Sequence, residues 1–350
     1  MKTFLTRRGA RRILGPLLTV LLAGGLVTGC SSGSSSAGSS PAGASAGSAA
    51  APVEWTWTDA TGTTVTLPQR PERVAGYADY AIGMFAYGLQ PAAVFGRVDV
   101  ATDPRFAGYD LSSTAIVGTS YGQIDLEALA AAEPDLIVTG IYPTDRAGTL
   151  DTTAPYYAFA DLEQQAQLAK IAPIVAIKVG GDGRAVIESL TGLATALGAD
   201  PDRVAAAKAD FDAAAADLTA AAGQADLEVT QMYADPDGIY VVKPADEPET
   251  QLYRSLGVTY TDLHPDGPYY WDIFSWENVG QMMTGDILLP NVEGFQAEEL
   301  MAQPTFAASP ALVAGQVNTW NGAALDYASQ AVQMGKLAEI LRSSRNVTGT

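Results

Sequence analysis

Residues 200–222 read DPDRVAAAKADFDAAAADLTAAA, an alanine-rich stretch that predicts one long helix. Asp200 is a suitable N-cap, and Pro201 fits the first helical turn. Apolar side chains recur every seven residues and form one stripe along the helix, at Val204, Phe211 and Leu218. A helix of this length extends about 30 Å, so it could bridge two lobes.

Short apolar strands alternate with helices on both sides of this stretch. Strands are expected over 73–77, 93–95, 135–139, 174–177, 228–233, 239–242, 286–289 and 317–320. Helices are expected over 81–89, 126–132, 184–197, from Ser275, and over 323–341. Such alternation indicates mostly parallel sheets covered on both faces. The predicted fold class is α/β, with two Rossmann-like lobes joined by the long rigid helix and a β-hairpin over 53–67.

The two halves also share a sequence unit. The first unit is Asp125-Leu126-Glu127, and Asp135-Leu136-Ile137-Val138 begins eight residues after its Glu. The second unit is Ser275-Trp276-Glu277, and Asp286-Ile287-Leu288-Leu289 begins nine residues after its Glu. Each unit offers an N-cap, an acid in the first helical turn and a buried strand. The repeat favours two similar lobes. The expected parts are an N-terminal lobe over 53–182, a helical connector over 183–224 and a C-terminal lobe over 225–350.

The N-terminus has the pattern of an export signal. Five basic residues come before any acid, and an apolar stretch over 13–27 follows them, too short to span a bilayer stably. Residues 26–30 read LVTGC and resemble a bacterial lipobox, so residues 1–29 are expected to be removed and Cys30 to carry lipid. The alternatives are a free Cys30 after an ordinary signal and export by the twin-arginine route rather than general secretion.

A flexible tether is expected over 30–52, because serine, glycine and alanine dominate there. The whole chain of 350 residues has 20 basic and 39 acidic residues, a net charge of −19. Without residues 1–29 the balance is 15 to 39, a net charge of −24. Such acidity argues against nucleic acid as a partner. A lipid anchor and a tether would hold the folded part at the outer face of the cell membrane.

Few residues offer catalytic or metal chemistry. The chain has one cysteine and one histidine, which excludes a multi-histidine or cysteine metal site. His264 lies in DLHPD, a pattern typical of a solvated turn, and residues 180–183 lack the lysine of a phosphate-binding loop. We therefore expect no enzyme, no catalytic residue and no direct metal ligand, although a secreted surface enzyme stays an alternative.

Aromatic residues, in contrast, gather where strands end. In α/β sheets, ligands bind beyond the carboxyl ends of the strands. The expected ligand contacts at these places are Tyr77, Tyr121, Gln123, Tyr142, Tyr233, Tyr270, Trp271 and Trp320. Tyr and Trp walls with few charges suit a bulky, mostly neutral and partly apolar ligand.

A set of short motifs, in order, resembles a known family. These motifs are PERV (71–74), VG (117–118), DLE (125–127), EPDLIV (133–138), IAPIV (171–175) and SWE (275–277). Together with the lipobox they resemble the iron-siderophore and cobalamin class of ABC-transporter substrate-binding lipoproteins over roughly residues 53–343. The resemblance implies two α/β lobes joined by a long helix, with a ligand cleft between them. It also implies that Glu127 and Glu277 dock the protein, as a monomer, on an ABC permease dimer with a cytoplasmic ATPase.

The resemblance also bears on the ligand. By position, Trp271 and Trp320 match aromatic contacts of hydroxamate-binding members, and Tyr77 and Tyr142 match more loosely. Ferric catecholates carry negative charge, and the absence of arginine near the aromatic loops argues against them. A ferric hydroxamate is therefore favoured, with cobalamin or haem as alternatives. Hydroxamate-binding members can carry an arginine in the loop that corresponds to residues 119–123. In this chain Tyr121 and Gln123 of the loop can donate hydrogen bonds but carry no charge, so Arg97 or Arg105 could take the place of that arginine.

Overall fold

The computed structural model describes residues 53–224, 226–282, 284–322 and 324–349. The predicted signal peptide, Cys30 and the tether lie outside the described residues. Within the described part, no helix is both long and apolar enough to cross a bilayer.

The predicted hairpin is confirmed. β1 (Trp55–Thr58) pairs antiparallel with β2 (Thr64–Leu67). Asp59 organises the turn, because its Oδ1 accepts from the backbone N–H of Thr61 over 2.9 Å and of Thr63 over 3.1 Å. Its Oδ2 accepts from the backbone N–H of Ala176 over 3.0 Å, which fixes the hairpin to the neighbouring sheet.

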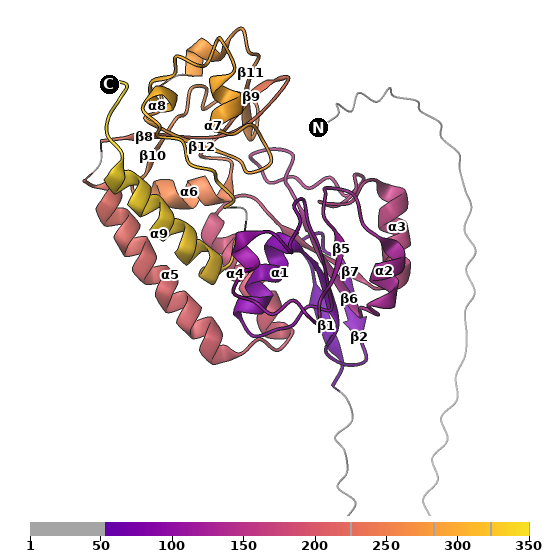
Figure 1. The fold of residues 1–350 in the computed structure, drawn as a ribbon. Coiled ribbons are helices and arrows are strands. Elements are labelled where there is room, and N and C mark those ends of the chain that lie inside the picture. The colour runs from indigo at the N-terminus through magenta and orange to yellow at the C-terminus, as the bar shows by residue number, and fades with distance from the viewer. Residues whose placement is uncertain (1–52, 225, 283, 323, 350) are drawn as a thin grey trace, which may run out of the picture. The chain divides into compact units, whose positions relative to one another are not determined.

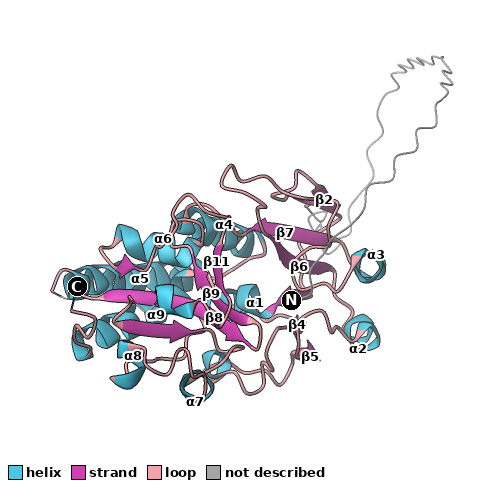
Figure 2. Cartoon of the chain, turned by 90° about the horizontal axis from the view of Figure 1, so that it is seen from above, coloured by secondary structure: helices cyan, strands magenta, loops and turns pink. Residues whose placement is uncertain are grey.

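The N-terminal sheet is entirely parallel, with the order β5-β4-β3-β6-β7. Its strands are β3 (Val74–Tyr77), β4 (Ala93–Phe95), β5 (Ala115–Gly118), β6 (Leu136–Ile141) and β7 (Ile174–Lys178). The helices α1 (Ala78–Ala86) and α4 (Gly183–Ala196) cover one face, and α2 (Leu126–Ala131) and α3 (Leu162–Ile171) cover the other (Figures 1 and 2). Every residue of β3, β4 and β6 is buried, as expected for a sheet covered on both faces.

The C-terminal sheet is mixed. Its longest strand, β8 (Glu228–Asp235), runs parallel to β10 (Thr259–Tyr260) and β12 (Ile287–Pro290). It is antiparallel to β9 (Gly238–Val242), which in turn pairs antiparallel with β11 (Trp271–Phe274). The shorter helical elements are η1 (Pro104–Phe106) in the N-terminal lobe and α6 (Pro248–Ser255), η2 (Val279–Met282), α7 (Ala297–Met301) and α8 (Pro310–Val313) in the C-terminal lobe.

One predicted element of this lobe is wrong, and another is confirmed only in part. The segment from Ser275 is a turn that leads into the 3₁₀ helix η2, because the indole of Trp276 is fixed to the carbonyl oxygen of Asp235 over 3.1 Å. Residues 317–320 run parallel to β12 in two isolated bridges rather than a continuous strand. The backbone N–H of Asn318 donates to the carbonyl of Leu288 over 2.9 Å, and that of Trp320 donates to the carbonyl of Pro290 over 2.8 Å. There the hydroxyl of Thr319 donates to Gln296 over 2.7 Å, and its carbonyl accepts from Lys336 over 2.8 Å.

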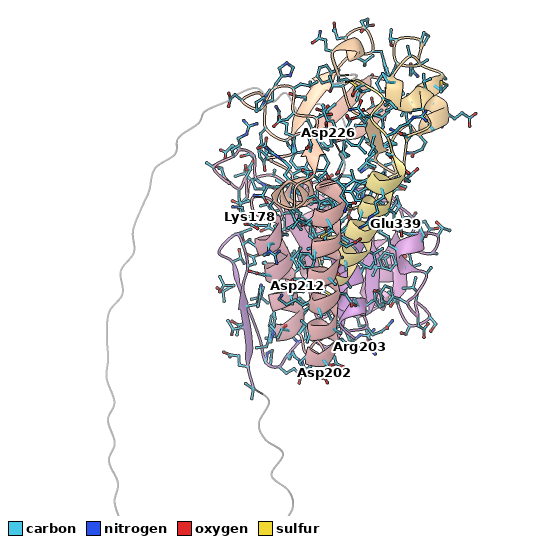
Figure 3. All side chains as sticks on the ribbon, turned by 90° about the vertical axis from the view of Figure 1, so that its left-hand side faces the viewer. Lys178, Asp202, Arg203, Asp212, Asp226 and Glu339 are labelled. Atoms are coloured by element: carbon cyan, nitrogen blue, oxygen red, sulfur yellow. The ribbon has the colours of Figure 1, made fainter. Side chains whose placement is uncertain are left out.

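The long helix is confirmed as α5 (Pro201–Ala222), and Asp200 caps it by accepting from the backbone N–H of Asp202 over 2.9 Å. It lies side by side with α9 (Tyr327–Ser343), as Figures 1 and 3 show. α9 begins four residues later than expected, because Asp326 is its N-cap.

A single hydrophobic cluster joins the two lobes through these helices. It contains buried side chains of β3 and β6, of α5 and α9, and of β8 and β12. Phe211 and Leu218 of the predicted stripe lie fully buried in it, and Val204 packs against it. The lobes are therefore joined by packed side chains as well as by backbone. The residue boundaries assigned above to the lobes and the connector stay predictions.

Candidate ligand-binding site

Three candidate side chains lie at or just beyond the carboxyl ends of parallel strands in the N-terminal sheet. Tyr77 ends β3, Arg97 lies two residues after β4, and Tyr142 follows β6 directly. These three strands are neighbours in the order β4-β3-β6 and run in the same direction, so their carboxyl ends share one edge. This edge is where ligands bind in open α/β sheets.

Tyr157 is the centre of an aromatic group at this edge. Its ring centroid lies 5.3 Å from that of Tyr77, 5.3 Å from that of Tyr121 and 4.7 Å from that of Tyr142. The backbone N–H of Tyr157 donates to the carbonyl of Gly140 on β6 over 2.8 Å. This bond fixes the loop after β6 on the sheet and places the ring between the other tyrosines.

The aromatic contacts continue into the C-terminal lobe. The centroid of Tyr142 lies 6.4 Å from that of Tyr270, and Tyr270 lies 5.1 Å from Trp271. Trp271 is 6.3 Å from Tyr240, which is 5.6 Å from Tyr233 on β8. Tyr80 joins the other end, 5.4 Å from Tyr77. We refer to this continuous set as the aromatic chain: Tyr77, Tyr80, Tyr157, Tyr121, Tyr142, Tyr270, Trp271, Tyr240 and Tyr233.

Burial raises the pKa of phenols in the aromatic chain further above neutral. It is the main cause that raises the pKa of Tyr157 to about 12, with the charge of Arg97 acting in the opposite direction. Burial likewise raises the pKa of Tyr142 and Tyr270 well above the ordinary value, and neighbouring phenols and carboxylates add to it. Their hydroxyls are protonated at neutral pH, as an ordinary tyrosine hydroxyl is, and stay so in alkaline solution, so each can donate a hydrogen bond to an acceptor oxygen.

Arg97 adds a positive charge to this edge, and its guanidinium contacts side chains of both lobes. Its Nη1 pairs with Glu293, which lies just beyond β12, and its Nη2 donates to Oδ1 of Asn321 over 2.7 Å. Its Nε lies 3.5 Å from Oδ2 of Asp79 at the start of α1. The expectation that no arginine lies near the aromatic loops is therefore wrong, because the charge of Arg97 acts on both Tyr77 and Tyr157.

A second ion pair between the lobes lies next to Tyr270. Arg146 binds the carboxylate of Asp246 through Nε and Nη2, each over 2.8 Å, and its Nη1 donates to the carbonyl of Gly267 over 2.9 Å. The same carboxylate accepts from the backbone N–H of Tyr270 over 3.0 Å. Tyr270 has φ +72°, a conformation that costs a non-glycine residue energy and that often occurs at functional sites. Asp246 thus helps to hold the Tyr270 ring at the junction of the lobes.

The structure brings six of the eight expected ligand contacts into the aromatic chain, namely Tyr77, Tyr121, Tyr142, Tyr233, Tyr270 and Trp271. Gln123 is exposed and bridges back to Ser120, outside these ring contacts. Trp320 is only 2% exposed, and its indole N–H bonds to the buried Glu249 over 2.9 Å.

Sequence reasoning missed Tyr80, Tyr157 and Tyr240. Tyr80 lies three residues after Tyr77 on α1, so a search for aromatics one helical turn after a strand end could have found it. Tyr240 is on β9, where its position opposite Tyr233 depends on the hairpin register. Tyr157 had no such signal, because a loop of irregular structure places it.

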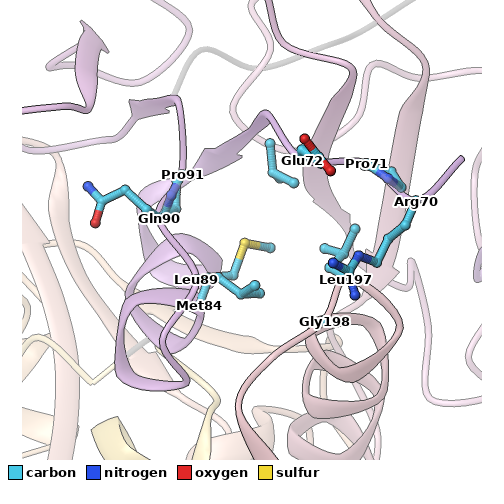
Figure 4. Close-up of a pocket in the computed structure, with 10 residues that line it drawn as sticks. Arg70, Pro71, Glu72, Met84, Leu89, Gln90, Pro91, Leu197 and Gly198 are labelled. Atoms are coloured by element: carbon cyan, nitrogen blue, oxygen red, sulfur yellow. The ribbon is translucent and has the colours of Figure 1, made fainter. Parts of the chain in front are cut away.

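A pocket of about 200 Å³ lies at the other edge of the N-terminal sheet (Figure 4). It is lined by Val74, the first residue of β3, and by Arg70 and Gly198, so it is separate from the aromatic chain. Among the described residues, no cluster of three or more His, Cys, Asp or Glu side chains could hold a metal ion. His264 is exposed, as its sequence context indicated.

The two candidate docking acids are both exposed. Glu127 lies in the first turn of α2, where Asp125 caps the helix. Glu277 lies in the turn before η2 rather than in a helix, which corrects the expectation that the two positions are equivalent.

The chain belongs to the periplasmic binding protein family, which it matches over residues 83–324. It is similar in structure to DesE, a ferric-siderophore receptor protein from Streptomyces coelicolor, with 28% identity and a TM-score of 0.72 over 84% of this chain and 99% of that chain. No curated protein sequence gives a match.

Two further solved structures share the fold. A siderophore periplasmic binding protein from the fuscachelin gene cluster of Thermobifida fusca has 22% identity and a TM-score of 0.56, over 78% of this chain and 97% of that chain. PiaA of Streptococcus pneumoniae in complex with ferrichrome has 16% identity and a TM-score of 0.54, over 82% and 97%. The resemblance to substrate-binding proteins of iron-siderophore transporters and the two-lobed α/β fold are thus confirmed.

Proposed function

We propose that the protein captures a ferric siderophore of the hydroxamate type outside the cytoplasm and delivers it to an ABC import permease. The aromatic chain carries this proposal, because it joins both lobes and combines apolar ring faces with protonated hydroxyls. Rings can pack on the apolar parts of a chelate, and the hydroxyls can donate to its oxygens. The description of the similar DesE as a ferric-siderophore receptor supports the same ligand class.

The proposed ligand contacts are the six expected residues that belong to the aromatic chain, extended by Tyr157 and Arg97. Arg97 takes the place of the arginine that loop 119–123 lacks, since its guanidinium lies at the carboxyl edge beside the aromatic chain. Arg105 is held away from this role by Asp103, to which it donates through Nε and Nη2.

Export and anchoring complete the proposal. Removal of residues 1–29 and lipidation of Cys30 would place a monomer at the outer face of the membrane, where a permease dimer with a cytoplasmic ATPase receives the ligand. The protein acts by binding and release, without turnover of its ligand. Replacing Cys30 with Ala should release the protein from the membrane fraction into the soluble exported fraction, and retention in the membrane fraction would contradict the anchor.

The decisive experiment is a titration of the purified body, residues 53–350, with a ferric trihydroxamate, a ferric tricatecholate, haem and cobalamin. Saturable quenching of tryptophan fluorescence by the trihydroxamate alone, at micromolar concentration or below, is the expected result. Tyr157→Ala should weaken binding by about 1–3 kcal/mol, the usual effect of losing an aromatic anchor. Tyr109→Ala is the matched control, since that ring stacks on Phe85 outside the aromatic chain. Preferred binding of cobalamin or haem would favour the alternative ligands, and binding of none of the four would refute the proposal.

A further inference from the structure

The guanidinium of Arg97 is already neutralised by the protein. It pairs with Glu293, lies 3.5 Å from Asp79 and donates to side-chain oxygens of Asn321 and, over 3.4 Å, Asn291. Its charge is therefore balanced by carboxylates that reach it from both lobes. A ligand oxygen approaching Arg97 would meet a hydrogen-bond donor, but no excess positive charge.

Arg97 belongs to a larger group that carries net negative charge. Asp79 also accepts from Nη1 of Arg105 over 2.7 Å, and Arg105 pairs with Asp103 over 2.7 Å. The group formed by Arg97, Arg105, Asp79, Asp103 and Glu293 thus has two positive and three negative formal charges. We call these five residues the charge cluster.

Glu293 differs from the rest of the charge cluster in position and exposure. Its side chain is 32% exposed, whereas those of the other four are 9% exposed or less. It is the member that the C-terminal lobe contributes, and it pairs with Arg97, two residues after β4. Its neighbour Gly294 packs against Tyr233, since a Cβ on Gly294 would lie 3.0 Å from Cδ2 of that ring. Glu293 therefore lies near both halves of the aromatic chain. Because its side chain is partly exposed, its carboxylate could face a bound ligand.

We infer that Glu293 determines the charge selectivity of the site, so that neutral or cationic ferric chelates are accepted and anionic ones are rejected. The inference rests on the proposed function and adds a specificity-determining residue to it. Its physical reason is Coulombic: a carboxylate next to a site shielded from water repels an anion more strongly than one in bulk solvent. An unpaired arginine in the same place would have the opposite preference.

The test uses one linear ferric trihydroxamate with three different ends, a free amine, an acetylated amine and a succinylated amine. The three chelates share the same iron centre and are cationic, neutral and anionic. Binding is measured by fluorescence titration at low salt on the unmodified body and on Glu293→Gln. Glutamine keeps a side-chain oxygen that can accept from Arg97, so loss of the charge is separated from loss of the contact. Glu298→Gln on α7 is the matched control, because it removes one exposed acid.

The unmodified protein should bind the cationic and neutral chelates at least tenfold more tightly than the anionic one. In Glu293→Gln the anionic chelate should gain about tenfold and the cationic one should lose, while the neutral one changes little and added salt reduces all differences. Equal affinities of the three chelates for the unmodified protein would overturn the inference, and so would an equal change of all three in Glu293→Gln. Absence of binding of every chelate to the unmodified protein would instead refute the proposed function.

Discussion

Trp320 donates its indole N–H to Oε2 of Glu249 over 2.9 Å, and the two side chains are 2% and 1% exposed. Gln330 and Gln231 also direct their amide groups to this carboxyl group, over 3.3 and 3.4 Å. Lys336 lies over the indole, 5.1 Å from the ring centroid. Trp320 was expected to contact the ligand, but its environment is that of a side chain that completes a buried polar network. This difference leads to a separate prediction for each of two tryptophans.

Replacing Trp320 with Phe should lower the stability more than the ligand affinity. The phenyl ring has no donor for Glu249, so the shortest of the three indole and amide hydrogen bonds to this buried carboxyl group is lost. Loss of a hydrogen-bond partner at a buried polar group costs about 1–3 kcal/mol. In contrast, Trp271→Phe should leave the melting temperature nearly unchanged and weaken chelate binding, because Trp271 is partly exposed within the aromatic chain. Thermal unfolding and fluorescence titration of both variants check this pair. A Trp320→Phe protein with normal stability and much weaker binding would restore Trp320 as a direct ligand contact.

Glu249 should make the protein less stable at alkaline pH. Burial, and then the carboxylate of Glu247, raise its pKa from 4.5 to about 8. Between these values the folded protein holds a proton that the unfolded chain has lost, so the free energy of unfolding falls as pH rises through this range. Glu249→Gln should therefore show a smaller loss of melting temperature between pH 5.5 and 8.5. Glu188→Gln, at an exposed position of α4, should lose as much as the unmodified protein. An equally large loss in Glu249→Gln would show that another group is responsible.

The lobes should move little when ligand binds. A shared hydrophobic cluster, the helix pair α5 and α9, and the ion pairs of Arg97 and Arg146 all connect them. Packed interfaces resist gradual deformation, since side chains lose contact as soon as they separate. Small-angle scattering profiles with and without a ferric chelate should therefore superimpose. A compaction of several ångströms on binding would contradict this expectation and would point to a hinge.

The elements that the sequence predicts correctly are those with local signals. Asp200 and Pro201 mark the start of α5, and alternating residues with a Thr61-Gly62 turn mark the hairpin. The helix expected at Ser275 failed because a tertiary contact, from the indole of Trp276 to the carbonyl of Asp235, competes with the local preference.

The site was predictable only as far as topology determines it. Parallel strands place their carboxyl ends at one edge of a sheet, so the sequence alone predicts that Tyr77 and Tyr142 lie at the same edge. Arg97 follows β4 in the same way, but its partners Glu293 and Asn321 are about 200 residues away in the sequence. Its role depends on contacts between lobes, for which a single sequence has no local signal.

Glu127 and Glu277 lie beyond the carboxyl edges of the two sheets. Glu127 is on α2, which follows β5 in the parallel N-terminal sheet. Glu277 follows β11, which pairs antiparallel with β9, and β9 pairs antiparallel with β8. β11 therefore runs in the direction of β8, and its last residue, Phe274, pairs with Ile239 near the carboxyl end of β8. The two acids thus correspond in sheet direction, although one is in a helix and the other in a turn.

Reversing both acids, with Glu127→Arg and Glu277→Arg, should abolish uptake of a radiolabelled ferric chelate by cells. Charges at a solvent-exposed rim act mainly on encounter and orientation, so ligand affinity and melting temperature should stay nearly unchanged. The control reverses Glu163 on α3 and Glu298 on α7, two exposed acids that lie in first helical turns as Glu127 does, so that net charge changes equally. An acid in a first turn also stabilises its helix by about 0.3–1 kcal/mol, which the control measures for α3 and α7. Normal uptake by the Glu127 and Glu277 double variant, or equal loss in the control, would remove these two residues from permease docking.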